Sequence, residues 1–329
     1  MEEGPLHEFE LISAWLRPFR SDHRTVLVPP GDDAAVLRPG LGRVLVATTD
    51  ALVDGVHFRS VIWPPRAVGG KAVAVNLSDL AAMGSKPCHA LVALGLPSEF
   101  SEKWLRQAAR GMASACSAAG VSLVGGNVTR ASDLSFTLTL LGEAREDRLL
   151  KRSGARPGDI IYVSGTIGDS ALGLESMLRR RHRPRRLNKL EARHCTPTAR
   201  VELGLQLAGK RAASAAIDIS DGLVADLGHL LAASGVGAEV LLEKIPLSLS
   251  YRRATAGTSN PFGAALSGGE DYELLFTAKP SRQEAIAAAS RKAGVPVNPI
   301  GRIVEGKEAR FIGLDGRLSK IGVGGWRHR

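Results

Sequence analysis

Residues 216–223, Ala-Ile-Asp-Ile-Ser-Asp-Gly-Leu, bring several hard oxygen ligands onto one short bend. The bend follows an apolar run, residues 215–219, that predicts a strand, and it leads into a sequence typical of a helix. Asp218, Ser220 and Asp221 on such a bend can direct their oxygens to one point. This arrangement suits Mg²⁺ that holds a polyphosphate.

Three further clusters repeat this chemistry where an apolar segment gives way to a turn or a helix. They are Gly31-Asp-Asp33, Thr48-Thr-Asp50 and Asn76-Leu-Ser-Asp79. Taken alone, the first cluster is more often a surface turn than a metal site, and helix or turn capping explains the second equally well. An inward-facing Asp79 in an otherwise apolar helix, however, needs a metal or an arginine as its partner. Together the clusters indicate a phosphate site with several metal ions.

Other segments are suited to phosphate or ligand contact. Gly125-Gly-Asn127 predicts a flexible turn, Lys151-Arg-Ser-Gly154 offers cationic groups, and Ser164 to Asp169 is a glycine-rich loop before a helix. The loop is neither a Walker A sequence nor a Rossmann fingerprint. His57 is a polar core residue or a phosphate contact, and Gly268-Gly-Glu-Asp271 is an acidic turn or a simple hairpin.

Strand and helix patterns alternate along the chain and predict an α/β or α+β fold. We expect helices over residues 6–16, 66–83, 101–119, 169–178, 200–208, 221–233 and 280–293, and strands over 43–47, 89–96, 121–124, 134–141, 160–163, 215–219, 272–277 and 297–303. The turn Ala155-Arg-Pro-Gly158 predicts a domain boundary, which divides the chain into residues 1–150 and 151–329.

Composition restricts the class of protein. The composition, 44% hydrophobic and 23% charged residues, is typical of a globular protein. A length of 329 residues is enough for two domains. No apolar run approaches the roughly 20 residues that span a bilayer, and the acidic start does not resemble a secretory signal. Three widely spaced cysteines predict neither a zinc cluster nor a disulfide framework. We expect a cytoplasmic protein without a membrane partner.

The net charge of +10 has a local source, because residues 179–186 contain six arginines. Such a run is either a nucleic-acid patch or a solvated loop that Pro184 interrupts. No aromatic stacking platform accompanies the run, which favours the solvated loop and no nucleic-acid partner. The remaining positive charge could steer a polyanionic ligand to the protein.

The ordered motifs resemble the thiamine-monophosphate kinase family. They are Gly31-Asp-Asp-Ala-Ala35, Thr49-Asp50 with Val56-His-Phe58, Asn76-Leu-Ser-Asp-Leu-Ala-Ala-Met-Gly84, Gly125-Gly126, Arg152-Ser-Gly154, Ile217-Asp-Ile-Ser-Asp-Gly-Leu223 and Gly268-Gly-Glu-Asp-Tyr-Glu-Leu274. The similarity runs from about Phe9 to Trp326. It implies the fold of the aminoimidazole ribonucleotide synthetase superfamily and a homodimer, in which the N-terminal half pairs with its copy and the C-terminal half packs alongside.

Carried over residue by residue, the resemblance implies three sets of contacts. The Mg²⁺ ligands would be Asp33, Thr48, Thr49, Asp50, Asp79, Asn127, Asp218 and Asp221; Gly126, Arg152 and Ser220 would contact ATP; His57, Glu270 and Trp326 would contact thiamine monophosphate. Two positions depart from the family. Asn127 stands where an aspartate is common, which predicts weaker binding of one Mg²⁺ or a water-mediated contact, and the tail Gly-Trp-Arg-His-Arg329 lacks an aromatic residue after its histidine.

The expected chemistry is direct in-line transfer of the γ-phosphoryl group of ATP to thiamine monophosphate. A phosphate monoester with a second pKa of about 6 is mostly deprotonated at neutral pH, so no catalytic base is expected. Several Mg²⁺ ions would offset the repulsion between two polyanions. Aminoimidazole ribonucleotide synthetase and selenophosphate synthetase are the alternatives within the superfamily; the absence of a cysteine before Cys88 argues against the second.

Overall fold

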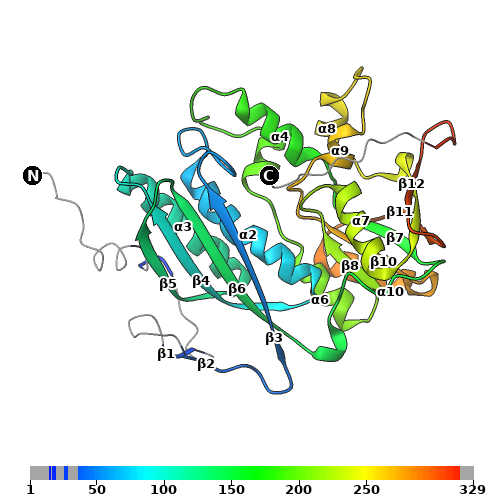
Figure 1. Ribbon diagram of the computed structural model, residues 1–329, viewed down its shortest axis with the longest axis horizontal. Coiled ribbons are helices and arrows are strands. Elements are labelled where there is room, and N and C mark those ends of the chain that lie inside the picture. The colour runs from blue at the N-terminus through cyan, green and yellow to red at the C-terminus, as the bar shows by residue number, and fades with distance from the viewer. Residues whose placement is uncertain (1–14, 16, 20–25, 29–35, 319–329) are drawn as a thin grey trace, which may run out of the picture. The chain divides into compact units, whose positions relative to one another are not determined.

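The computed structural model describes residues 15, 17–19, 26–28 and 36–318. The chain forms two compact units (Figure 1), which we treat separately. The first comprises Met1–Leu77, Pro87–Glu143 and Arg180–Arg185, and the second comprises Ser78–Lys86, Ala144–Arg179 and Arg186–Arg329. Both units combine helices with a sheet, which confirms the predicted α/β class. Asp33, Trp326 and most of the helix expected over residues 6–16 lie outside the described residues.

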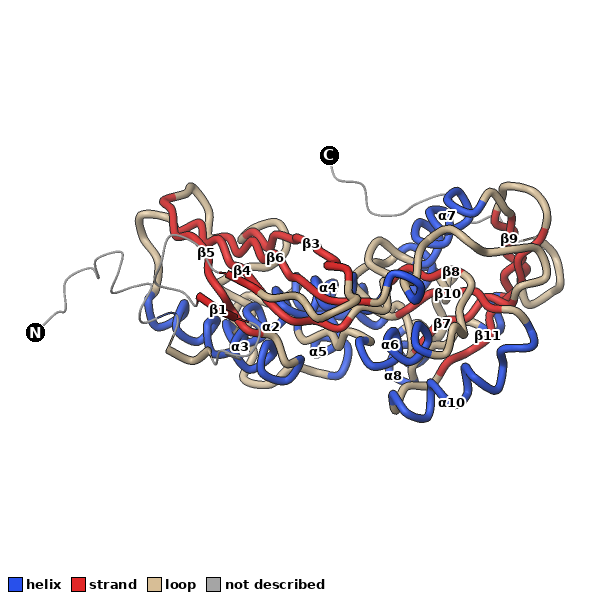
Figure 2. Tube along the Cα trace, turned by 90° about the horizontal axis from the view of Figure 1, so that it is seen from below, coloured by secondary structure: helices blue, strands red, loops and turns tan. Residues whose placement is uncertain are grey.

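The first unit is built on a four-stranded sheet in the order β3-β6-β4-β5. Its elements are β1 (Val26–Val28), β2 (Val36–Leu37), β3 (Val44–Val53), α2 (Pro65–Ala82), β4 (Lys86–Leu96), α3 (Glu102–Ala119), β5 (Ser122–Arg130) and β6 (Ser135–Ala144). Figure 2 shows α2 and α3 on one face of this sheet. Every second residue of β6 is buried, as expected of a strand with one covered face. The last residues of α2 belong to the second unit.

Helix α3 begins and ends as the sequence predicts. The Ser101 hydroxyl accepts the Trp104 backbone N–H at 3.3 Å, and Gly120 closes the helix in the left-handed conformation with a φ of 67°. The Trp104 ring stacks on Phe58 and Phe136 with centroids 6.0 and 6.2 Å apart. These aromatic contacts join the helix to the sheet and to the segment after β3.

Two of the strands that carry predicted site residues are longer than predicted. Strand β3 does not end before Thr48 but continues to Val53, and β5 does not end at Val124 but continues to Arg130. Gly125, Gly126 and Asn127 are therefore strand residues rather than a flexible turn. Parallel pairing with β4, shifted in register at Ala90/Leu91, keeps the glycine pair extended, and local composition does not reveal such a partner.

The second unit has a six-stranded sheet in the order β12-β9-β11-β7-β10-β8. Its elements are the 3-10 turn η1 (Glu146–Arg148), β7 (Ile160–Ser164), α4 (Asp169–Leu178), α5 (Lys189–Cys195), α6 (Val201–Gly209), β8 (Ala215–Asp218), α7 (Leu223–Ser234), β9 (Gly237–Leu241), η2 (Leu242–Lys244), α8 (Leu249–Ala254), α9 (Gly263–Ser267), β10 (Leu274–Ala278), η3 (Pro280–Arg282), α10 (Gln283–Ala293), β11 (Val297–Val304) and β12 (Ala309–Ile312). The strand pairs are antiparallel except β12 with β9.

This sheet is covered on both faces. Ile161 and Val163 of β7 pack with α7, whereas Tyr162 packs with α6 and α10. Because neighbouring residues of a strand point to opposite faces, both sets of side chains are buried, and residues 160–163 of β7 form a continuous hydrophobic run before Ser164. The register pairs Leu274 with Asp218, so the segment before β10 lies beside the bend after β8.

None of the helices within the described residues is both long and apolar enough to cross a membrane.

Candidate functional site

The bend after β8 is held by a carboxylate of the helix that follows. Asp226 in the first turns of α7 turns one oxygen, Oδ2, back toward residues 220–222. That oxygen accepts the backbone N–H groups of Ser220, Asp221 and Gly222 at 3.0, 3.0 and 3.1 Å. Burial raises the pKa of Asp226 to about 7, and these N–H groups oppose the shift. Asp226 therefore fixes the backbone on which Ser220 and Asp221 are carried.

Asp218 lies at the buried end of β8 among other acids. It is 4% exposed, and its Oδ2 accepts the hydroxyl of Ser78 at 2.7 Å. Burial, and then the negative charge of Asp79, raise the pKa of Asp218 to about 7. Asp79 and Ser78 come from the end of α2 that belongs to the second unit. The structure thus brings together two of the predicted metal ligands, Asp79 and Asp218.

This donor set fits Mg²⁺. Within the described residues, no group of three or more His, Cys, Asp or Glu side chains forms a metal cage. Mg²⁺ does not require one, since it keeps several waters and is usually held by one or two carboxylates together with substrate phosphates. The repulsion between Asp79 and Asp218 is what a divalent cation would neutralise.

Residues 268–273 lie directly on this bend. The Glu270 N–H donates to Ser220 O at 2.7 Å and the Tyr272 N–H donates to Ile219 O at 2.8 Å. A Cβ on Gly269 would stand 2.3 Å from the Ser220 carbonyl oxygen, so only glycine allows this approach. Glu270 and Tyr272 have φ angles of 66° and 53°, which side chains rarely adopt. The segment is therefore a strained turn rather than a simple hairpin.

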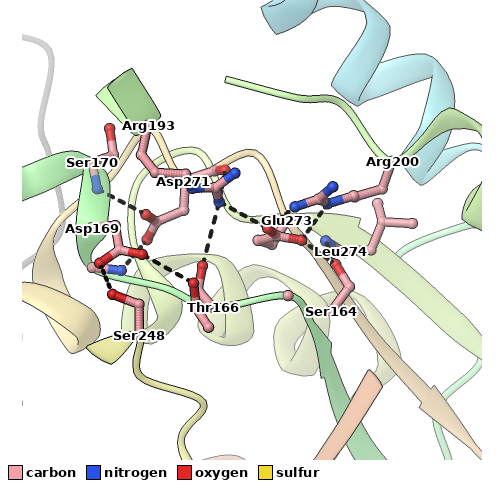
Figure 3. A network of polar contacts seen from close by, with 12 residues as sticks. Ser164, Thr166, Asp169, Ser170, Arg193, Arg200, Ser248, Asp271, Glu273 and Leu274 are labelled. Carbon is pink, nitrogen blue, oxygen red and sulfur yellow. Dashed lines mark hydrogen bonds and ion pairs between the residues drawn. The ribbon is translucent and has the colours of Figure 1, made fainter. Parts of the chain in front are cut away.

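The strained turn directs two acids inward (Figure 3). Asp271 accepts the backbone N–H groups of Gly168 and Ser170 at 2.7 and 3.3 Å, which caps the start of α4. Glu273, fully buried, accepts hydrogen bonds from Ser164 Oγ at 2.6 Å, Arg193 Nη2 at 2.8 Å and the Arg200 guanidinium. One segment therefore holds both ends of the glycine-rich loop that runs from Ser164 to Asp169.

Three predicted ligands of the first unit lie inside β3. Alternation places Thr48 and Asp50 on one face of the strand and Thr49 on the other. The Thr49 hydroxyl donates to Leu138 O at 3.0 Å and accepts the Thr139 hydroxyl at 3.1 Å. Thr48 and Asp50 are therefore directed to one side, and the Thr49 hydroxyl is engaged with β6.

Gly126 and Asn127 lie in β5, opposite Val92 and Ala93 of β4. Both are exposed. A Cβ on Gly126 would stand 1.9 Å from Val92 O, so strand packing by itself requires this glycine. The role of Gly126 in contacting ATP stays a prediction, as does a metal contact for Asn127.

His57 lies in a half-buried turn after β3. The Val53 N–H donates to His57 Nδ1 at 3.1 Å, so the neutral ring carries its proton on Nε2 and can donate from there. The turn is tied at Ser60, whose carbonyl oxygen accepts Trp104 Nε1 at 2.9 Å and Arg183 Nη2 at 2.7 Å. One arginine of the basic run thus has a structural partner in the first unit.

Arg152 is exposed beside the start of β8. Its carbonyl oxygen accepts the Ser234 hydroxyl at 3.0 Å, which fixes the backbone and leaves the side chain at the surface. Of the predicted site residues, Asp79, Asp218, Ser220, Asp221 and Glu270 are gathered in the second unit, and Thr48, Thr49, Asp50, His57, Gly126 and Asn127 lie in the first.

The residues that hold these site residues in place were not predicted from the sequence. Asp226 had a signal, since an acid in the first turns of a helix can accept the unpaired N–H groups at its start. No sequence signal marks Arg193 and Arg200, because their partner Glu273 is 80 and 73 residues away along the chain.

Family models match both parts of the chain. The family model described as AIR synthase related protein, N-terminal domain, matches residues 31–144, and that for the C-terminal domain matches residues 156–313. The thiamine-monophosphate kinase of Salmonella typhimurium is 41% identical over 323 residues, covering 98% of each chain. That of Aquifex aeolicus is 40% identical over 302 residues, covering 91% of this chain and 92% of the relative.

Solved structures lead to the same family. The crystal structure of thiamine-monophosphate kinase from Stenotrophomonas maltophilia K279a superposes with a TM-score of 0.80 at 37% identity, covering 94% of this chain and 95% of that one. AaThiL complexed with AMPPCP and TMP gives a TM-score of 0.77 at 36% identity, covering 100% and 99%. The HypE hydrogenase maturation protein, at 21% identity and a TM-score of 0.75, shares the fold alone. With both domain models matched and about 40% identity over nearly its whole length, the chain belongs to the thiamine-monophosphate kinase family.

Proposed function

We propose that this protein transfers the γ-phosphoryl group of ATP to thiamine monophosphate, giving thiamine diphosphate and ADP, the last step in making thiamine diphosphate. The observation that carries the proposal is the acidic bend after β8, where Asp218 stands beside Asp79 and Asp226 fixes the backbone of Ser220 and Asp221. Relatives of this name at about 40% identity, and one solved with AMPPCP and TMP, support the choice of substrates.

Asp79, Asp218 and Asp221 are the acids of the second unit that would hold Mg²⁺. The oxygen ligands proposed for the rest of the chain are Asp33, Thr48, Thr49, Asp50 and Asn127. Bound there with ATP, Mg²⁺ would neutralise phosphate charge and so reduce the repulsion between donor and acceptor. Asn127 supplies a neutral oxygen, which predicts a weaker contact than a carboxylate would give.

The residues of the chain would position both substrates. Gly126, Arg152 and Ser220 are proposed to contact ATP, Arg152 through a side chain that the structure leaves exposed. His57, whose Nε2–H can donate, suits the phosphate of the acceptor. Glu270 suits the cationic part of thiamine, and Trp326 is proposed to stack on its pyrimidine. An acceptor phosphate that is already ionised needs no base, so transfer depends on positioning and charge.

We further propose that the working form is a cytoplasmic homodimer whose functional domains are residues 1–150 and 151–329. The uncovered face of the four-stranded sheet carries Leu45 and Leu91, which are 55% and 37% exposed, and a second copy of the chain would cover them. The three cysteines are thiols, which suits a reducing compartment.

The direct test is a product assay with purified protein, Mg²⁺-ATP and thiamine monophosphate. We expect thiamine diphosphate and ADP in equal amounts, and no product when thiamine replaces its monophosphate. Folded dimer that makes no thiamine diphosphate with ample Mg²⁺ would exclude the proposal and turn attention to the purine-pathway reaction of the superfamily.

A further inference from the structure

A buried histidine stands behind Glu270, and the chemistry described above does not use it. His194 Nδ1 lies 3.3 Å from Glu270 Oε2 and 3.1 Å from Ser170 Oγ. The side chain of His194 is 1% exposed, whereas that of Glu270 is 26% exposed. The carboxylate can therefore be reached by a ligand, and the histidine behind it cannot.

The geometry assigns the proton on this ring. An unprotonated Nδ1 would direct its lone pair at a carboxylate oxygen, which is repulsive. A proton on Nδ1 is instead shared between Glu270 Oε2 and the Ser170 hydroxyl oxygen, as inferred from the hydrogen-bond partners. His194 thus donates to the carboxylate proposed to meet the acceptor.

The surroundings of His194 are rigid. It lies at the end of α5, which begins with a capping box between Asn188 and Glu191. The residue before it, Arg193, donates to buried Glu273, and Ser170 lies in the first turn of α4 beside the cap made by Asp271 (Figure 3). The donor that faces Glu270 therefore has a fixed position.

Glu270 needs such a donor because its side chain is long and its backbone is strained. The bond from its N–H to Ser220 O fixes the main chain at a φ of 66°, but it leaves the side-chain torsions undetermined. A carboxylate that meets a ligand loses rotamer freedom on binding, and a hydrogen bond present beforehand reduces that loss.

We propose that His194 is a positioning residue, which holds the Glu270 carboxylate in the orientation that binds the cationic acceptor. This inference rests on the proposed function, because it names thiamine monophosphate as that acceptor. It adds a residue that acts through Glu270 and does not itself touch the substrate.

The test compares three substitutions in the full-length protein. His194→Asn keeps an N–H donor close to the place of Nδ1–H, whereas His194→Gln moves the donor toward the place of Nε2 and His194→Ala removes it. We expect Gln and Ala to raise the KM for thiamine monophosphate about tenfold, as for the loss of one hydrogen bond to a charged group. The KM for ATP should stay within about twofold, and Asn should restore most of the affinity.

A double mutant tests whether His194 acts through Glu270. With Glu270→Ala in place, adding His194→Ala should raise the KM for thiamine monophosphate by less than about twofold. Additive losses, equal increases in the KM for both substrates, or failure of Asn to rescue would each overturn the positioning role. An inactive wild type would instead overturn the proposed function. In that case the free energies of unfolding in urea of the His194→Ala, Glu270→Ala and double variants would decide whether His194 holds Glu270. Additive losses of stability would overturn that contact.

Discussion

Removing the Asp226 carboxylate should loosen the bend that carries the proposed metal ligands. One oxygen accepts three consecutive N–H groups, of which Gly222 is buried while Ser220 and Asp221 are half-buried. Leaving a buried N–H without a partner costs about 1–3 kcal/mol, and water can partly satisfy the other two at about 0.5 kcal/mol each. Asp226→Ala should therefore lower the free energy of unfolding by about 2–4 kcal/mol. Asp226→Asn keeps an acceptor oxygen and removes a buried charge, so it should cost less than about 1 kcal/mol.

Urea unfolding followed by circular dichroism gives these free energies, and hydrogen exchange of the amides of residues 220–222 locates the effect. We expect exchange to quicken in Asp226→Ala and to change little in His229→Ala, an exposed position on the same helix. If Ala and Asn destabilise the protein equally, or if those amides exchange as in wild type, the carboxylate does not hold the bend and the reasoning fails.

Three further predictions concern the network around Glu273, the buried acid Asp271 and the basic run. Glu273→Gln leaves Arg193 and Arg200 without their carboxylate and should lower the free energy of unfolding, measured in urea, by about 3–5 kcal/mol. The control, Glu239→Gln in the surface pair with Arg302, should lower it by less than about 1 kcal/mol. Equal losses in the two variants would contradict this prediction. Burial raises the pKa of Asp271 to about 8, against about 4 when unfolded, so its contribution to stability is present below about pH 4 and is lost as the pH rises through 8. Asp271→Asn should flatten that slope in urea titrations between about pH 5 and 8, and an unchanged slope would refute the assignment. Replacing Arg181 and Arg185 together by Ala, which keeps the Arg183 contact to Ser60, should leave kcat/KM within about twofold, and any nucleic-acid binding that disappears with the substitution would support the alternative role of the run.

Local patterns were sufficient to predict much of the fold. Helix α3 was predicted with its Ser101 cap and Gly120 end, and α4 and α7 were predicted to within about two residues. Helix caps and apolar periodicity depend on residues that are close in sequence, so they can be recognised locally. The strands β3 and β5 were predicted too short. Pairing with a distant strand keeps Thr48 to Asp50 and Gly125 to Asn127 extended, and their own composition does not encode that partner.

The candidate site likewise contains residues that a local motif predicts and residues that only the fold brings together. The acids of the bend at Asp218 and Asp221 could be found because a short motif carries them. Asp271 and Glu273 were recognisable as part of a motif, but the side to which each points depends on the left-handed backbone of Glu270 and Tyr272. His194 and Arg193 reach the turn only through the fold, since 76 and 80 residues separate them from Glu270 and Glu273 along the chain.

The central claim is that Mg²⁺-dependent phosphoryl transfer to thiamine monophosphate depends on the acids of the two units. It is tested most directly by measuring thiamine diphosphate formed by wild type, Asp50→Ala and Asp221→Ala over a range of Mg²⁺ concentrations, with circular dichroism to verify folding. We expect product from wild type and a loss of at least about a hundredfold in kcat/KM in both folded variants, partly recovered at high Mg²⁺. Variants that turn over as fast as wild type at low Mg²⁺ would contradict the claim.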